Sequence, residues 1–180
     1  MSIHVVAVSG SPRAGGYTRQ ALEHVLRTAE ALDADVETEL LDLRTVDLPL
    51  YDPDRPEAER GDAPDALRLV RRADAVVLGS PVYHSSYSST FKNFHDYCGF
   101  DEYEDTVVGL VAVAGGGSYG STLEHMRSTV RGVHGLVVPQ QVGIRNASGK
   151  FVDGEVTDDG IRDRLDALAE QVVDYTDRLA

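Results

Sequence analysis

The stretch that decides the fold is Ile3-His4-Val5-Val6-Ala7-Val8-Ser9-Gly10-Ser11-Pro12-Arg13-Ala14-Gly15-Gly16-Tyr17-Thr18. Its apolar first half stops at glycine, proline and serine, which predicts a buried strand followed by a loop. Beyond Thr18, which is available as a helix N-cap, apolar residues recur at helical spacing as Ala21, Leu22, Val25, Leu26, Ala29 and Leu32. The stretch therefore predicts a strand, a loop and a helix in immediate succession.

The same alternation continues along the chain. Further strands are predicted at 36–41, 74–79, 106–114 and 136–139, and further helices around 66–70, 91–98, 123–130 and 161–172. Strands buried between two helical layers are continuous apolar runs, as most of these are. We therefore expect one α/β domain over residues 1–180, with a doubly wound parallel sheet, in which ligands bind beyond the carboxyl ends of the strands.

Composition excludes several classes of protein. The formal net charge of −13 repels nucleic acid and anionic membrane surfaces. No apolar run approaches the roughly 20 residues of a membrane span, and the N-terminus lacks an export pattern, so we expect a cytoplasmic protein. Cys98 is the only cysteine, which excludes an iron–sulfur site built from this chain alone, and no metal site is expected.

The basic residues are also unusual. Lys92 and Lys150 are the only lysines among 17 lysines and arginines, against an aspartate-rich acidic set. This bias resembles that of salt-loving archaea, whose proteins carry highly acidic surfaces. We therefore expect a halophilic origin.

The first loop has the chemistry of a phosphate cradle. Candidate contacts are hydroxyls, an arginine and the start of a helix, namely Ser9, Ser11, Arg13, Gly16, Tyr17 and Thr18. Gly16-Tyr17 stand where a nucleoside triphosphatase loop needs Lys and Ser/Thr, and Pro12 stands where the dinucleotide pattern needs glycine. A single phosphate of a mononucleotide fits better.

Two further loops supply groups for a planar ligand. The loop after the strand at 74–79 offers aromatic, imidazole and hydroxyl groups at Pro81, Val82, Tyr83, His84, Ser85 and Ser86. The loop after 106–114 offers backbone donors at Gly115, Gly116, Gly117, Ser118 and Tyr119. From the residues alone, Tyr83 is either a ligand contact or a packing tyrosine, and His84 either a ligand contact or solvent-facing.

Together these segments resemble the NADPH-dependent FMN reductase family. Ser9-Gly10-Ser11-Pro12-Arg13 with Gly16-Tyr17-Thr18 is similar to that family's phosphate loop. Ser80-Pro81-Val82-Tyr83-His84-Ser85-Ser86 with Lys92-Asn93 is similar to its segment beside the flavin ring. Val82 replaces a frequent glutamate, and Ser88-Ser89 replace a frequent proline-glycine pair.

The resemblance implies a flavodoxin-like three-layer sandwich with a five-stranded parallel sheet in the order 2-1-3-4-5. It implies bound FMN, with NAD(P)H as electron donor and a small-molecule acceptor such as free flavin or quinone. All 17 candidate residues named above would then contact the cofactor, and no catalytic side chain is needed because flavin N5 carries the chemistry. The resemblance also implies a homodimer or homotetramer. It does not decide whether NADH or NADPH is the electron donor.

Two alternatives belong to other classes. Gly116-Gly117-Ser118-Tyr119-Gly120 matches G-x-S-x-G, the nucleophile pattern of serine hydrolases, but no histidine follows residue 134 to complete a triad. The same sheet with FMN also serves as an electron carrier without nicotinamide turnover.

Overall fold

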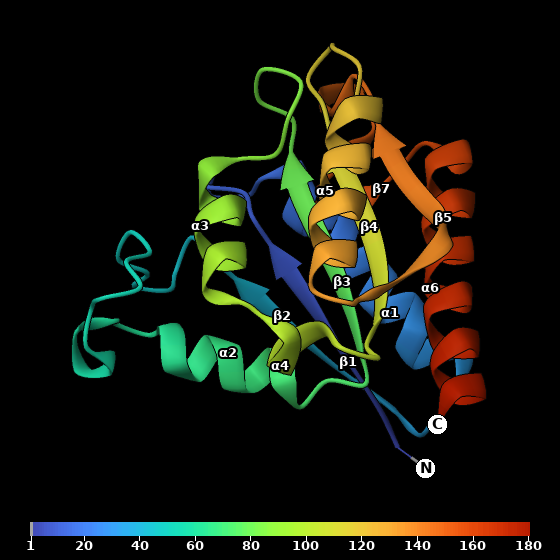
Figure 1. The fold of residues 1–180 in the computed structure, drawn as a ribbon. Coiled ribbons are helices and arrows are strands. Elements are labelled where there is room, and N and C mark those ends of the chain that lie inside the picture. The colour runs from blue at the N-terminus through green and yellow to red at the C-terminus, as the bar shows by residue number, and fades with distance from the viewer. Residues whose placement is uncertain (1) are drawn as a thin grey trace.

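A five-stranded parallel sheet forms the middle layer of the molecule (Figure 1). The computed structural model describes residues 2–180. The strands are β1 (Ile3–Ser9), β2 (Val36–Asp42), β3 (Ala75–Pro81), β4 (Val107–Val113) and β5 (Leu136–Ile144), and they lie in the order β2-β1-β3-β4-β5. The flavodoxin-like strand order expected from the sequence is confirmed.

Helices cover both faces of this sheet. One face packs against α1 (Tyr17–Leu32) and α6 (Asp159–Leu179), and the other against α2 (Ala63–Arg71), α3 (Ser89–Tyr97), α4 (Phe100–Tyr103) and α5 (Gly120–Gly132). Along β1, Val5 and Ala7 enter the first core, whereas Val6 and Val8 enter the second. Two-sided burial explains why the central strands are continuous apolar runs.

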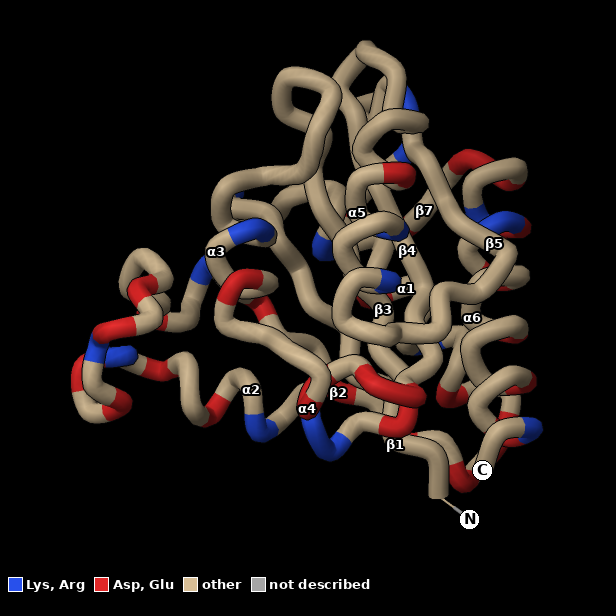
Figure 2. Tube along the Cα trace, in the orientation of Figure 1, with Lys and Arg blue, Asp and Glu red and all other residues tan. Residues whose placement is uncertain are grey.

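The carboxyl ends of the strands lie opposite both chain termini (Figure 1). The loops after β1, β3 and β4 therefore come together at one end of the sheet, as the doubly wound topology requires. The loops after β3 and β4 contain no acidic residue, whereas acidic residues are frequent in the excursion between β2 and α2 and along α6 (Figure 2).

Several local predictions need correction. Thr18 is not the N-cap of α1: Gly16 occupies that position without a side-chain cap, and Thr18 is buried in the first turn. The strand at 136–139 extends to Ile144, and its register against β4 shifts between Val108 and Leu110. Asp158 caps α6, since its carboxylate accepts from the Ile161 amide at 2.9 Å.

Short elements also appear that the sequence did not predict. They are α4, the 3₁₀ turns η1 (Glu57–Glu59) and η2 (Ala147–Gly149), and a two-stranded hairpin of β6 (Phe151–Val152) and β7 (Glu155–Val156). The hairpin brings Phe151 against Tyr17, with ring centroids 5.3 Å apart. It therefore covers the start of α1 from the side.

A buried histidine lies in the second core. His95 stacks on Phe91, with centroids 5.6 Å apart, and its Nδ1 has no hydrogen-bond partner among residues 2–180. Burial lowers the pKa of His95, and Lys92 adds to this, while a backbone hydrogen bond at Thr129 and the charge of Asp96 oppose it. The imidazole is therefore held neutral in the folded protein.

We expect this histidine to destabilise the fold in acid. The unfolded chain binds a proton at His95 near the ordinary pKa of about 6.5, whereas the folded chain does so only at lower pH. Stability should therefore fall as the pH drops through that window. Thermal melting between about pH 8 and 5 should be less pH-dependent in His95→Gln than in the wild type. Parallel curves for His95→Gln and the wild type would contradict the assignment.

Candidate functional site

A cleft of ≈ 510 Å³ opens at the carboxyl ends of β1, β3 and β4. This volume lies within the usual range for small-molecule and cofactor sites. Nine of the predicted residues line it: Ser11, Arg13, Gly16, Tyr17, Thr18, Pro81, Val82, Tyr83 and Gly115. The three loops singled out in the sequence thus contribute to one cavity.

The loop after β1 is folded tightly around Ser11. The buried Ser11 Oγ accepts from the Arg13 amide at 3.3 Å, and a Cβ on Gly16 would lie only 2.5 Å from the same Oγ. Gly15 has φ +63°, a conformation that glycine adopts at little cost. The glycines at 15 and 16 are therefore required by the shape of the loop.

The start of α1 presents free donors to this loop. The helical hydrogen bonds begin with the Gln20 amide donating to the Gly16 carbonyl, so the amides of residues 17–19 have no intrahelical acceptor. No side chain caps them. Together with the positive end of the helix dipole they favour an anion.

Polar side chains beside the loop after β1 differ in whether they are free to bind a ligand. Ser9 Oγ is fully buried at the end of β1 and has no hydrogen-bond partner among residues 2–180. Arg13 is exposed and forms no ion pair within the same residues, whereas Arg19 is committed to Glu23 at 2.7 Å and Asp42 at 3.3 Å. Arg13 is thus the arginine able to meet a ligand at this loop.

The loop after β3 makes a tight turn beside the cleft. Tyr83 and Ser86 exchange two backbone hydrogen bonds, of 2.8 and 3.0 Å, around His84 and Ser85, which have φ of 50° and 63°. The Ser86 amide is consumed within the turn, so it is not a free donor. Tyr83 lines the cleft and is 40% exposed, while His84 is exposed outside the cleft.

Helix α5 holds this turn at two points. Ser121 Oγ donates to the Ser85 carbonyl at 2.7 Å, and His125 Nδ1 lies 3.0 Å from Ser86 Oγ. Left-handed backbone at two successive non-glycine residues costs about 1 kcal/mol or more for each residue, and it persists where surrounding contacts over-determine it. Sequence spacing gave no signal for Ser121 or His125, because both contacts join distant segments.

One residue of the loop after β4 lines the cleft, and another packs against the sheet. Gly115 lines the cleft, and a Cβ on Gly115 or Gly117 would meet no protein atom within 4 Å. The ring of Tyr119 instead covers Gly143 of β5, where a Cβ would lie 1.9 Å from the Tyr119 ring. Tyr119 is therefore a packing residue in this structure.

The serine of the hydrolase pattern has no histidine partner among residues 2–180. Ser118 is exposed, and the bond its Oγ forms is with the Gly120 amide at 3.4 Å. His125 instead contacts Ser86, and His134 contacts Glu104. The geometry gives a Ser118 nucleophile no base.

Predicted and observed cleft residues overlap in part. The cleft does not include the predicted Ser9, His84, Ser85, Ser86, Gly116, Gly117, Ser118 and Tyr119. Six residues that were not predicted also line the cleft: Ala14, Gly15, Val113, Ala114, Ala147 and Ser148. The last two come from the turn after β5. The small or apolar side chains of these six residues carry no chemical signal in the sequence.

The Lys92-Asn93 pair on α3 lies elsewhere. Lys92 pairs with Asp96, and Asn93 Oδ1 accepts from the Tyr51 amide at 2.8 Å. The Asn93 amide group also donates to the carbonyls of Leu48 and Pro49. Asn93 therefore fastens the excursion after β2 to α3, and neither residue lines the cleft.

Comparison with known proteins identifies the family of the chain. Residues 3–149 match the family described as NADPH-dependent FMN reductase. The chain is 34% identical over 157 residues to an NADPH azoreductase of Bacillus sp. (strain OY1-2), covering 86% of this chain and 83% of the relative. It is 28% identical over 173 residues to an FMN-dependent NADPH-azoreductase of Staphylococcus haemolyticus (strain JCSC1435), covering 93% and 92%.

Solved structures share the fold. The flavoenzyme NAD(P)H:(acceptor) oxidoreductase FerB from Paracoccus denitrificans superimposes with a TM-score of 0.78 at 20% identity, covering 98% of each chain. An apo form of the NADH:FMN oxidoreductase EmoB superimposes with a TM-score of 0.75 at 19% identity, covering 99% of this chain and 91% of the other. The chain belongs to the NADPH-dependent FMN reductase family and is an FMN-binding oxidoreductase that uses NAD(P)H as electron donor.

Proposed function

We propose that FMN binds in the cleft with its phosphate on the loop after β1 and its ring between the loops after β3 and β4. The observation that carries this proposal is the uncapped start of α1 opening into the cleft beside the free Arg13. The orphaned Ser9 Oγ and the close Gly16–Ser11 approach suit a small, densely bonded anion. The other predicted contacts in these loops are proposed as neighbours of the ring.

The lining suits a reaction carried by the cofactor. Among the described residues, no carboxylate, imidazole, amine or thiol lines the cleft, so its hydroxyl groups have no neighbouring base there that would activate them as nucleophiles. Bound FMN supplies the hydride-accepting atom, N5. Val82, Tyr83 and Val113 exclude water from one side, and the free amides of α1 hold the phosphate end in place.

The absence of carboxylates also resolves a conflict of charge. A chain of net charge −13 must attract two anions, FMN and NAD(P)H. The loops after β3 and β4, which contain no acidic residue, and the free Arg13 keep the local environment favourable, while the repulsion from acidic residues farther away than the screening length of about 8 Å is largely screened.

For the substrates, we propose NADPH as the preferred donor and azo compounds, quinones or free flavin as acceptors. The two relatives described above are named NADPH azoreductases. Tyr83 is 40% exposed at the cleft, which leaves room for a planar acceptor beside it.

The test is the absorption spectrum of the purified protein followed by NADPH oxidation with and without a quinone or azo dye. We expect stoichiometric FMN and acceptor-dependent turnover. Bound FMN that NADPH reduces only negligibly under anaerobic conditions would instead support the electron carrier. A covalent adduct of Ser118 with a serine-directed phosphonate would support the hydrolase.

Arg13→Ala should weaken FMN binding about 10- to 30-fold, because one charge-assisted hydrogen bond to the phosphate contributes about 1.5–2 kcal/mol. Riboflavin, which lacks the phosphate, should bind the variant and the wild type alike. Fluorescence titration with both ligands measures the difference. Equal losses for FMN and riboflavin would place Arg13 away from the phosphate.

We further propose one domain over residues 1–180, since both cores share one sheet, and assembly into a homodimer or a tetramer built from it. No helix among residues 2–180 is long and apolar enough to cross a membrane, and a cytoplasmic location stays a proposal. The halophilic archaeal origin rests on composition alone and is likewise proposed.

A further inference from the structure

The segment that follows β5 reaches the cleft. Residues 145–156, which we name the closing segment, run from the end of β5 through η2 and the hairpin of β6 and β7. Ala147 and Ser148 of η2 line the cleft directly. The family match ends at residue 149, before the hairpin begins. The hairpin is therefore a feature of this chain that the family match does not cover.

At one end the closing segment is fastened to the loop after β4. Arg145 Nε donates to the Gly116 carbonyl at 2.9 Å. The amide of Ala147, which is buried in the first core, donates to the Ala114 carbonyl at 3.4 Å. Since Ala114 and Ala147 both line the cleft, these bonds hold two parts of its lining together.

At the other end the closing segment meets the start of α1. The Phe151 ring is buried and stacks on Tyr17, with the two ring planes 27° apart. Tyr17 is half-buried and lines the cleft, and its amide is one of the free donors at the start of α1. The stack therefore fixes the position of a residue that belongs to the proposed phosphate site.

The hairpin that carries Phe151 is built as a rigid unit. Asp153 and Gly154 form its two-residue turn with φ of 51° and 87°, and Asp-Gly is a preferred pair for such turns. Three contacts anchor the closing segment to α1 and to the start of α6: Lys150 with Asp158 at 2.8 Å, Glu155 with Arg27 at 3.0 Å, and the Val156 carbonyl with Arg162 at 2.8 Å. With both ends held, the closing segment forms a fixed wall rather than a mobile lid.

We propose that the closing segment is the fourth wall of the cofactor cleft, and that Phe151, as a positioning residue acting through Tyr17, slows the release of FMN. The loops after β1, β3 and β4 form the other walls. Because the closing segment joins the loop after β4 to the start of α1, these two walls cannot separate unless the ring stack or the anchoring contacts break. The inference rests on the proposed FMN site and specifies what keeps the cofactor in it.

Replacing the Phe151 ring tests this wall. Phe151→Leu keeps an apolar side chain in the core but removes the ring that faces Tyr17, so FMN release should become about three- to tenfold faster. Phe151→Tyr keeps the ring and should release FMN at nearly the wild-type rate. The association rate should differ much less among the three proteins, since changes at one binding site act mostly on the release rate.

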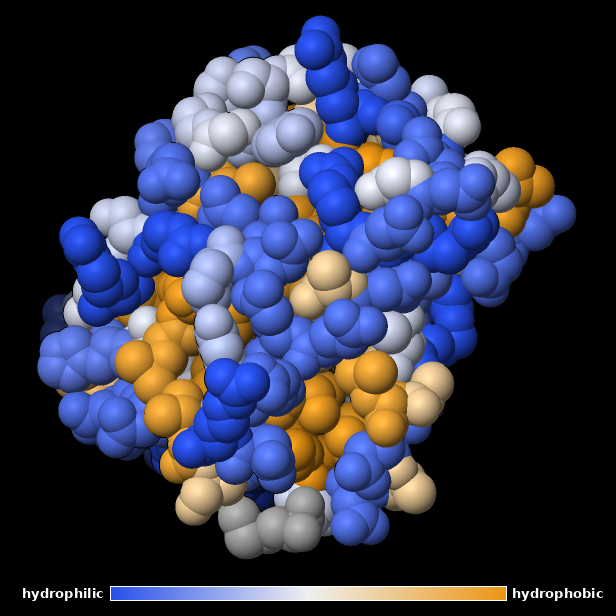
Figure 3. All heavy atoms as spheres, turned by 90° about the vertical axis from the view of Figure 1, so that its right-hand side faces the viewer, coloured by the Kyte–Doolittle hydropathy of each residue, from blue (hydrophilic) through white to orange (hydrophobic). Residues whose placement is uncertain are grey.

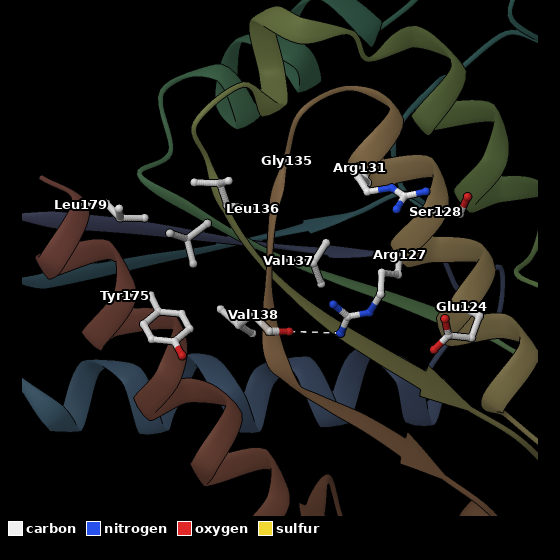
Figure 4. A pocket seen from close by; sticks show the side chains of 11 residues that line it. Glu124, Arg127, Ser128, Arg131, Gly135, Leu136, Val137, Val138, Tyr175 and Leu179 are labelled. Carbon is white, nitrogen blue, oxygen red and sulfur yellow. Dashed lines mark hydrogen bonds between the residues drawn. The ribbon is translucent and has the colours of Figure 1, made fainter.

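Tyr175→Leu is the matched control. The side of the molecule that carries α6 shows its apolar surface in the lower half, away from the carboxyl ends of the strands (Figure 3). Tyr175 packs on the same core as Phe151, but it lines a separate groove of ≈ 840 Å³ between α5, β5 and α6 that shares no residue with the cleft (Figure 4). The control therefore loses a ring from the same core, and its FMN release rate should equal that of the wild type.

The FMN-loaded proteins are diluted, and the FMN still bound is measured at timed intervals by rapid gel filtration, well below the melting temperature of each variant. The wall is overturned if Phe151→Leu releases FMN at the wild-type rate, if Phe151→Tyr releases it as fast as Phe151→Leu, or if Tyr175→Leu accelerates release equally. Each of these results would leave the FMN site standing. A wild-type chain that takes up no FMN would contradict the proposed cofactor site, and the wall with it.

Discussion

Gly16→Val is expected to weaken FMN binding by about 100-fold or more, which corresponds to about 2.7 kcal/mol. A Cβ at this position would lie 2.5 Å from Ser11 Oγ and 3.3 Å from the Arg13 carbonyl. The branched side chain must therefore push the loop away from the start of α1, where the free amides are. Because we propose that those amides and Arg13 all bind the phosphate, displacing the loop would remove several contacts at once.

The measurement is fluorescence titration of the apoprotein with FMN and riboflavin. Riboflavin should lose much less affinity, since the disturbed loop faces only the phosphate. Because Gly16 and Ser11 are buried, the variant should also lower the melting temperature of the apoprotein, and the comparison with riboflavin separates this loss of stability from the loss of the phosphate site. An unchanged FMN affinity would mean that the phosphate lies elsewhere.

Gly143→Ala should lower the free energy of unfolding by about 3 kcal/mol, at the upper end of the usual range for an overpacked site. Gly143 is buried in β5, and the new methyl group would lie 1.9 Å from the Tyr119 ring. Neither the strand nor the ring can move without disturbing the second core. For a chain of this length, we expect the melting temperature to fall by roughly 6–12 °C.

Gly132→Ala is the matched control. Gly132 lies at the end of α5, where a Cβ meets no protein atom within 4 Å, and alanine favours the helix. Its melting temperature should stay the same or rise. Equal melting temperatures for the two variants would show that the Tyr119 ring adjusts freely.

Strands buried on both faces were predictable because their sequences need no alternation. β1, β3 and β4 are continuous apolar runs, and each was expected within a residue or two of its bounds. β5 was predicted too short because it is an edge strand: Pro139, Gln140 and Gln141 interrupt the apolar pattern, and Arg127 and Gln171 supply the hydrogen bonds from outside the strand. A local sequence pattern cannot show hydrogen-bond partners that lie far away in the sequence.

The same difference between local patterns and contacts with distant residues applies to the candidate site. That the loop after β1 lines the cleft was expected, because its glycines, hydroxyls and arginine lie next to one another in the sequence and directly before the helix. Tyr119 was expected to face a ligand, yet its ring fills the space left by Gly143, a pairing across two loops. Thr18 has a capping side chain, but α1 begins two residues too early for Thr18 to act as its cap.

The two hydrogen bonds from α5 to the turn at His84 and Ser85 have a thermodynamic consequence. Ser121 and His125, which hold the turn, both belong to α5. A shift of α5 would change the turn beside the cleft, and occupancy of the cleft would in return bias the position of α5. Linkage makes this coupling reciprocal: a contact on α5 that tightens FMN binding by some factor is itself strengthened by bound FMN in the same measure.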